Sequence, residues 1–158
     1  MKLAIASDLS GFSLKNSIIA HLRESHQDIE LLDFGIESEQ GPKPYFEQAP
    51  KVARAIQDKV AERGILICGT GQGMAIVANK HKGIYACVVD SIFSGQRAKI
   101  INNANVITLG GWVTAPFIAR EIVDGWLEMK FTQKMEFKRD FLTSAFNKVR
   151  EMEEDLFK

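Results

Sequence analysis

The sequence predicts an α/β fold, in which a five-stranded parallel sheet is flanked by helices and followed by a C-terminal helical extension. Two observations carry this prediction. Short β-branched and apolar runs alternate along the chain with segments whose apolar residues recur at helical spacing, which is typical of parallel strands joined by helices. The expected strands are also apolar throughout rather than at alternate positions, which indicates burial on both faces of the sheet.

The first part of the chain contains two strands and two helices. We expect strands at residues 2–6 and 29–34, because both are short apolar runs. The segment 37–44 is polar and rich in Pro and Gly, so it is expected to be a loop. Helices are predicted at 14–22 and 45–60, where apolar residues fall on one helical face.

The second part of the chain continues the alternation with three more strands. The expected strands are residues 64–68, 84–89 and 105–109, and the expected helices are residues 74–79, 94–101 and 116–127. The length of 158 residues suits one domain and is too short for two ordinary ones. We therefore predict a single Rossmann-like α/β domain over residues 1–131.

Residues 132–158 form a C-terminal helical extension outside this alternation. A charged amphipathic helix is expected from about Lys134 to the end of the sequence, with an apolar stripe that includes Phe137 and Phe141. Two interpretations of this stripe stay open. The helix either packs on its own domain or covers a partner subunit.

The composition excludes several classes of protein. Twenty acidic residues balance 20 basic ones, so nothing in the net charge suggests a nucleic-acid or membrane partner. No apolar run approaches the roughly 20 residues of a membrane span, and the N-terminal run ends too early for a signal peptide. These features predict a cytoplasmic protein with two reduced cysteines, Cys68 and Cys87. The cysteines lack metal-ligand spacing and the three histidines do not cluster near them, so no metal site is expected.

The sharpest chemical signal is the segment 68–74, Cys-Gly-Thr-Gly-Gln-Gly-Met, which joins a buried strand to a helix. Alternating glycines let the backbone approach a ligand and turn its N–H groups inward, and the N-terminus of the next helix favours an anion. Ligands of parallel sheets bind beyond the carboxyl ends of the strands, where this segment falls. It matches neither the P-loop nor the dinucleotide-binding fingerprint.

Cys68 stands where a reactive group would act on such a ligand. A thiolate there can take a proton while neighbouring N–H donors hold the resulting oxyanion. The alternative, a small apolar residue that ends a strand, is equally open, whereas Cys87 is interpreted as a core residue. Asp8 either binds a substrate hydroxyl or, more simply, caps the next helix. Asn102 belongs to a polar cluster for which a turn is the default interpretation.

Together these segments resemble the type B ribose-5-phosphate isomerases and the related galactose-6-phosphate isomerase subunits. The motifs that carry the resemblance are Ser7-Asp8, Gly11-Phe12, Leu14-Lys15, Asp33-Phe34-Gly35, the run from Gly64 to Gly71, Ala78-Asn79-Lys80, Asn102 with Ala104-Asn105-Val106, and Ile122-Val123-Asp124. The resemblance implies an aldose–ketose isomerase that interconverts a small sugar phosphate through a cis-enediolate. It implies neither a metal nor an organic cofactor.

The resemblance also assigns roles to residues. The implied catalytic residues are Cys68, which shuttles a proton between two sugar carbons, and Thr70, which helps to move a hydroxyl proton. The implied substrate-binding residues are Asp8, Ser10, Tyr45, Gly69, Gly71, Gln72, Gly73, Met74, Asn102 and Arg139. The family forms dimers whose sites borrow residues from the partner's C-terminal segment. We therefore expect a homodimer or homotetramer, or a hetero-oligomer with a paralogue, with the extension at the dimer interface.

Several positions depart from the family pattern. Leu9 and Ile101 stand where the family has histidines, and the one replaced by Ile101 opens the furanose ring. Pro44 replaces an aspartate, and Trp112 and Met135 replace arginines that grip the phosphate. Two hypotheses follow: an isomerase whose substrate arrives open-chain, such as a four-carbon ketose phosphate, or a binding subunit that is active only with a paralogous partner. A receiver or flavin module is disfavoured, since a receiver needs an acidic residue at the end of its third strand.

Overall fold

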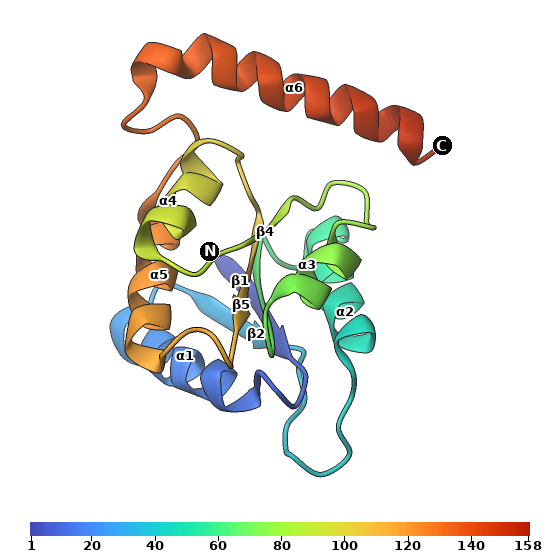
Figure 1. Cartoon of the computed structure of the whole chain (residues 1–158), viewed down its shortest axis with the longest axis vertical. Coiled ribbons are helices and arrows are strands. Elements are labelled where there is room, and N and C mark those ends of the chain that lie inside the picture. Colours follow the sequence, from blue (N-terminus) through green and yellow to red (C-terminus); the bar gives the residue numbers. More distant parts are fainter.

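The computed structural model describes all 158 residues and contains one five-stranded sheet (Figure 1). Its strands are β1 (Lys2–Ser7), β2 (Glu30–Asp33), β3 (Arg63–Cys68), β4 (Ala86–Val88) and β5 (Val106–Gly110). The strand order is β2-β1-β3-β5-β4, and every neighbouring pair is parallel. The predicted fold class is confirmed.

Helices cover both faces of this sheet. They are α1 (Phe12–Ser25), α2 (Tyr45–Gln57), α3 (Gln72–Ala78), α4 (Ile92–Ile100), α5 (Pro116–Glu128) and α6 (Arg139–Leu156), with a short 3₁₀ turn, η1 (Glu136–Lys138), before the last. Helices α1, α4 and α5 pack on one face, and α2 and α3 pack on the other (Figure 1). Along β1, Leu3 and Ile5 join the first core while Ala4 and Ala6 join the second. Both faces are buried, as the continuous apolar runs predicted.

A buried ion pair ties α1 to the end of β2. The side chain of Lys15 is only 1% exposed, and its Nζ lies 2.7 and 3.0 Å from the two carboxylate oxygens of Asp33. The same ammonium donates to the carbonyl of Ile36 at 2.7 Å. A charge so deeply buried needs such partners, because removing them would leave it desolvated and uncompensated.

A second cation, the Arg63 guanidinium, caps the C-terminus of α5. The Arg63 guanidinium donates to the carbonyls of Trp126, Leu127 and Met129 at 3.1–3.3 Å, so it satisfies acceptors that the helix end leaves free. Nearby, burial and, after it, the positive charge of Arg63 lower the pKa of Lys99 to about 8. The folded protein therefore holds the proton of the Lys99 ammonium less tightly than the unfolded chain does.

The ends of some elements differ from those expected. Helix α2 stops at Gln57 rather than residue 60, because Lys59 takes a left-handed backbone conformation with φ of 57°. Strand β4 is shorter than expected, because the Tyr85 amide donates to the Asn105 side chain instead of a neighbouring strand. Cys87, in this edge strand, is half-buried rather than a full core residue as expected.

Helix α6 lies across one end of the domain and begins at Arg139, later than the expected Lys134 (Figure 1). Its contacts with the body include Glu153, whose carboxylate accepts hydrogen bonds from the Tyr85 hydroxyl at 2.9 Å and the Gly83 amide at 2.6 Å. Only Leu142 of this helix is buried. The helix therefore packs on its own domain over part of its length.

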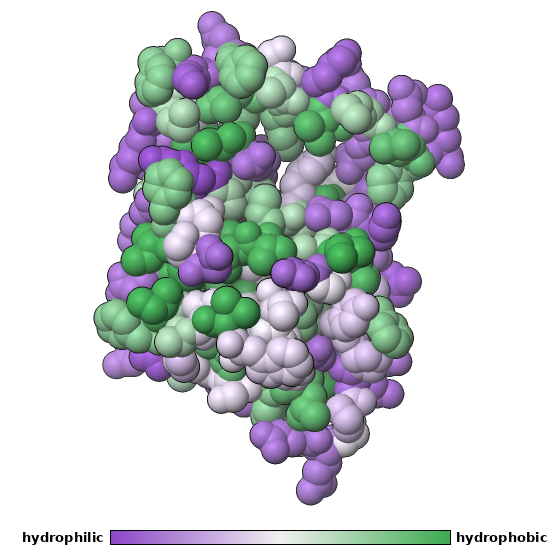
Figure 2. Space-filling model, in the orientation of Figure 1, coloured by the Kyte–Doolittle hydropathy of each residue, from purple (hydrophilic) through white to green (hydrophobic).

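An apolar groove of about 310 Å³ runs between α6 and the body (Figure 2). It is lined by residues that include Tyr85, Cys87, Asn102, Phe141 and Val149. Phe141 remains 70% exposed, so the groove leaves much of the apolar stripe of α6 uncovered. No helix of the chain is long and apolar enough to cross a membrane.

Candidate active site

The loops that follow β1, β3 and β5 meet at the carboxyl edge of the sheet. Backbone hydrogen bonds fasten them together: the Asp8 amide donates to the Ile67 carbonyl at 3.2 Å, and the Gly111 amide donates to the Cys68 carbonyl at 2.7 Å. The Trp112 amide donates to the Gly69 carbonyl at 2.9 Å. The site is thus built on three central strands, the rigid part of the fold.

A cavity of about 350 Å³ opens between these loops and α2. It is lined by Asp8, Ser10, Tyr45, Cys68, Gly69, Thr70, Gln72, Gly73, Ile76 and Trp112. Most of the residues expected at the site are therefore brought together by the fold. No lysine or arginine lines this cavity, and Lys43 lines an adjoining depression that shares Asp8 and Ser10 with it.

Cys68 ends β3 with its thiol at the cavity. The residue is 5% exposed, and its Sγ accepts a hydrogen bond from the Gly71 amide at 3.1 Å. Gly71 has φ of 80°, a left-handed conformation that a side chain would strain. A sulfur that accepts such a bond is better able to carry negative charge.

Two aromatic rings wall the cavity. A Cβ added to Gly69 would lie 2.7 Å from the Trp112 ring, so only glycine lets the indole lie against the loop. Tyr45, the first residue of α2, lies against Gly73 on the opposite side. The indole is 76% exposed, so the wall that it forms faces solvent on its outer side.

Asp8 lines the cavity and also has a structural bond. Its Oδ1 accepts a hydrogen bond from the Gly11 amide at 3.1 Å, in the turn that leads into α1. Burial raises the pKa of this carboxyl group, and backbone hydrogen bonds from Gly11 and Ser10 oppose the rise. The turn and the ligand-facing interpretations of Asp8 are therefore compatible.

Three expected site residues lie elsewhere. The side chain of Met74, in α3, is fully buried in the core that it shares with α2, so it does not line the cavity. Asn102 precedes β5 and so lies at the amino edge of the sheet, where it lines the groove beneath α6. Arg139 begins α6 and is exposed away from the Cys68 cavity. Within one chain, neither Asn102 nor Arg139 reaches Cys68.

Sequence reasoning missed Ile76 as a lining residue. It is 63% exposed at the mouth of the cavity, one helical turn after Gln72. The spacing of four residues along α3 was the available signal, because such residues share one face of a helix.

Comparisons with known proteins agree with this geometry. A family model described as Ribose/Galactose Isomerase matches residues 3–141. The chain is 42% identical to the 4-deoxy-4-sulfo-D-erythrose isomerase of Clostridium sp. strain MSTE9, over 100% of this chain and 99% of that protein. It is 40% identical to the D-erythrulose-4-phosphate isomerase of Pectobacterium atrosepticum strain SCRI 1043, over 83% of this chain and 85% of that protein. The ribose-5-phosphate isomerase B structure from Clostridium thermocellum superimposes with a TM-score of 0.89, at 33% identity over 99% of each chain.

These similarities define the class of protein first: it is an enzyme, an isomerase with a Rossmann-like α/β fold. More narrowly, the chain belongs to the ribose/galactose isomerase family of sugar-phosphate isomerases. The family assigned from the sequence motifs is confirmed.

Proposed function

We propose that this enzyme interconverts the aldose and ketose forms of an open-chain four-carbon sugar with a terminal sulfonate. The observation that carries the proposal is the cavity itself, in which Cys68 and the glycine loop line a space to which their own chain brings no lysine or arginine. The other supports are the residues that depart from the family pattern and the names of the two relatives compared above.

Cys68 serves as the base in this proposal. Its thiolate removes the proton from C2 of the aldose, the electron pair forms a C1–C2 double bond, and the carbonyl oxygen becomes the enediolate oxygen. The loop amides from Gly69 to Gly73 hold that oxyanion. The thiol then returns the proton to C1, while Thr70 moves the hydroxyl proton from O2 to O1 so that C2 becomes the ketone. No redox partner is consumed, because the two carbons exchange oxidation state.

A four-carbon substrate explains the two absent imidazoles. An aldose closes a furanose ring through its C4 hydroxyl. That hydroxyl is missing in a 4-deoxy-4-sulfo tetrose and esterified in a tetrose 4-phosphate. Such substrates stay open-chain, so the enzyme needs no acid to open a ring, and Leu9 and Ile101 remove nothing that the reaction requires.

Charge favours a sulfonate over a phosphate. A sulfonate carries one negative charge, whereas a phosphate monoester carries about 1.5 to 2 at pH 7. The chain lines its own cavity with no lysine or arginine, and Trp112 stands where the family pattern has an arginine, so Arg139 of a second chain would be the one arginine left to hold the anion. The Clostridium relative named for a sulfo-tetrose also aligns over the whole chain, including α6. A tetrose 4-phosphate is the second candidate, favoured by the name of the Pectobacterium relative.

A second copy of the chain completes the site in this proposal. Asn102 and Arg139 are expected to contact the substrate, yet both lie away from the Cys68 cavity of their own chain. Across a homodimer they serve the partner's cavity, and Phe137 and Phe141, 80% and 70% exposed, cover the partner. Two-fold symmetry makes this exchange reciprocal. A dimer with a paralogue is the alternative partner, and we place either in the cytoplasm, where both free thiols stay reduced.

Subunit complementation tests the shared site. Arg139→Ala and Cys68→Ala chains, each inactive alone, should regain activity when mixed, because one of the two heterodimer sites carries both intact residues. Exchange of subunits is followed independently with fluorescent labels. Mixtures that exchange fully and stay inactive would exclude the sharing of Arg139 between subunits.

A substrate panel tests the reaction. The purified chain is assayed with 4-deoxy-4-sulfo-erythrose, erythrose 4-phosphate and ribose 5-phosphate, each with its ketose. We expect the highest kcat/KM for the sulfonate, a lower value for the tetrose phosphate and the lowest for ribose 5-phosphate. Preference for ribose 5-phosphate would contradict the proposal, and activity that appears only with an added paralogue would support the alternative subunit function.

A further inference from the structure

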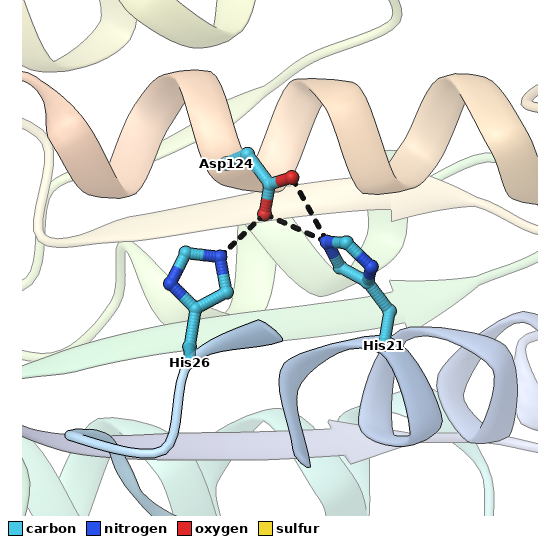
Figure 3. Close-up of side chains that lie close together, drawn as sticks. All are labelled: His21, His26 and Asp124. Atoms are coloured by element: carbon cyan, nitrogen blue, oxygen red, sulfur yellow. Dashed lines mark hydrogen bonds and ion pairs between the residues drawn. The ribbon is translucent and has the colours of Figure 1, made fainter. Parts of the chain in front are cut away.

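Two histidines and an aspartate converge between α1 and α5 (Figure 3). His21 lies in α1, His26 directly follows that helix, and Asp124 lies in α5. His21 Nε2 is 2.8 and 2.9 Å from the two carboxylate oxygens, and His26 Nε2 is 2.7 Å from Oδ1. All three side chains are half-buried, at 16%, 20% and 28% exposure.

This cluster lies far from the proposed chemistry. His26 precedes the first residue of β2, so the cluster is at the amino edge of the sheet, opposite the Cys68 cavity at the carboxyl edge. None of its residues lines that cavity. A function for the cluster therefore has to be sought outside the isomerase reaction.

The carboxylate of Asp124 is not neutralised by a lysine or arginine. Its polar contacts are the two imidazoles. Arg120, one helical turn earlier on α5, donates instead to the Ser17 hydroxyl at 3.0 Å. A half-buried carboxylate that faces two ring nitrogens presents an anionic set of three ligands, which suits a cation.

The geometry fits a small divalent ion. The three candidate ligand atoms all lie within 4.8 Å of one another. Zinc binds imidazole nitrogen and carboxylate oxygen at about 2.0–2.2 Å, so ligand atoms around it stand about 3.3–3.6 Å apart. The present 2.7–2.9 Å separations between nitrogen and oxygen would have to open by several tenths of an ångström, while the two imidazole nitrogens, which lie within 4.8 Å of each other, would have to close toward about 3.3–3.6 Å. The rings meet edge to face, with a 73° angle between their planes, so they are not stacked against each other.

We propose that His21, His26 and Asp124 bind one zinc ion, with water in the remaining position. Two imidazoles and a carboxylate suit zinc among the common metals, whereas calcium and magnesium prefer oxygen ligands alone. The ion cross-links α1 to α5, two helices on the same face of the sheet, and so stabilises the fold without taking part in isomerisation. This proposal departs from the sequence-based expectation of no metal, which considered only the surroundings of the two cysteines.

Zinc titration of the metal-free, tag-free full chain tests the site. We expect one zinc ion per chain. His26→Gln and Asp124→Asn should each weaken binding by at least 10-fold, as should His21→Gln. The matched control is His81→Gln, which changes the remaining histidine, also half-buried but bonded to the Val77 carbonyl outside the cluster. The control should bind as tightly as the wild type.

Two further measurements locate the ion and its effect. With zinc at 100 times its dissociation constant, the unfolding equilibrium of the wild type should shift about 100-fold, or about 2.7 kcal/mol, and that shift should shrink in the cluster variants. Cobalt in place of zinc should give visible bands without thiolate charge transfer, which would arise at Cys68 or Cys87. Isomerase turnover should be unchanged by a chelator. No binding, equal binding by the cluster variants and the wild type, or a thiolate band would each overturn the proposal, and the three nitrogen and oxygen ligands would then form only a hydrogen-bonded cluster.

Discussion

The substitution Gly71→Ala tests most directly whether the hydrogen bond from the Gly71 amide helps Cys68 to act as the base. The position has φ of 80°, which costs a residue with a side chain about 1–2 kcal/mol. The new Cβ would also lie 3.1–3.2 Å from backbone atoms of Leu109, so the loop or β5 must move by a few tenths of an ångström. That movement weakens the 3.1 Å hydrogen bond from the Gly71 amide to Cys68 Sγ.

The magnitudes follow from these contacts. A hydrogen bond to a charged group contributes about 1.5–3 kcal/mol, so its loss should lower kcat roughly 10- to 100-fold. Strain and contact together should lower the free energy of unfolding by about 2–3 kcal/mol. Gly83→Ala is the matched control, because Gly83 has φ of 78° with nothing within 4 Å of the added Cβ. It should cost only about 1 kcal/mol and leave kcat unchanged.

The assay combines urea unfolding with steady-state kinetics at saturating substrate. Gly71→Ala and Gly83→Ala are compared with the wild type under the same conditions. If both variants lose the same stability and Gly71→Ala keeps wild-type kcat, the amide of Gly71 does not support the base.

Two further predictions concern buried charges. Asp33→Asn should lower the free energy of unfolding by about 3 kcal/mol, because it leaves the Lys15 ammonium buried without its anion. Glu30→Gln, in the same strand, removes only an exposed ion pair with Lys2 and should cost less than about 1 kcal/mol, and equal losses in urea unfolding would contradict the role of burial. Lys99 has a folded pKa lowered from 10.5 to about 8, so between these values the unfolded chain binds the proton that the folded chain has lost. The free energy of unfolding should therefore gain a favourable contribution as pH rises from about 8 to 10.5, and Lys99→Met should remove that contribution. Identical pH profiles of stability for the wild type and Lys99→Met would refute this prediction.

The arrangement of strands and helices followed from the periodicity of apolar residues, because that periodicity is set by which faces are buried. The ends of the elements depended on single residues. The left-handed backbone at Lys59 ended α2, and the Asn105 side chain took the Tyr85 amide that would have lengthened β4. Neither a backbone angle nor a partner 20 residues away is visible in a hydrophobic pattern.

The site was predictable where one physical rule governed it. Parallel strands gather their carboxyl ends at one edge, and this rule brought Asp8 and Cys68 into one cavity. The same rule separates Asn102, which precedes its strand, from this cavity, and in the proposed dimer it would serve the cavity of the second chain. The side chain of Met74 does not line the cavity, because its face of α3 points into the core. The contact between His21 and Asp124 spans 103 residues, and no motif spacing indicates such a pair.

Deuterium incorporation tests the proposed chemistry most directly. The four-carbon ketose sulfonate is incubated in heavy water with the wild type, Cys68→Ala or Cys87→Ala, and label in the aldose is followed by NMR. Cys87 is the matched control, a half-buried thiol outside the cavity. The account predicts label at C2 of the product with the wild type and Cys87→Ala, and a rate roughly 10²- to 10⁴-fold lower with Cys68→Ala. A Cys68→Ala enzyme that forms labelled aldose at the wild-type rate would contradict the assignment of Cys68 as the base.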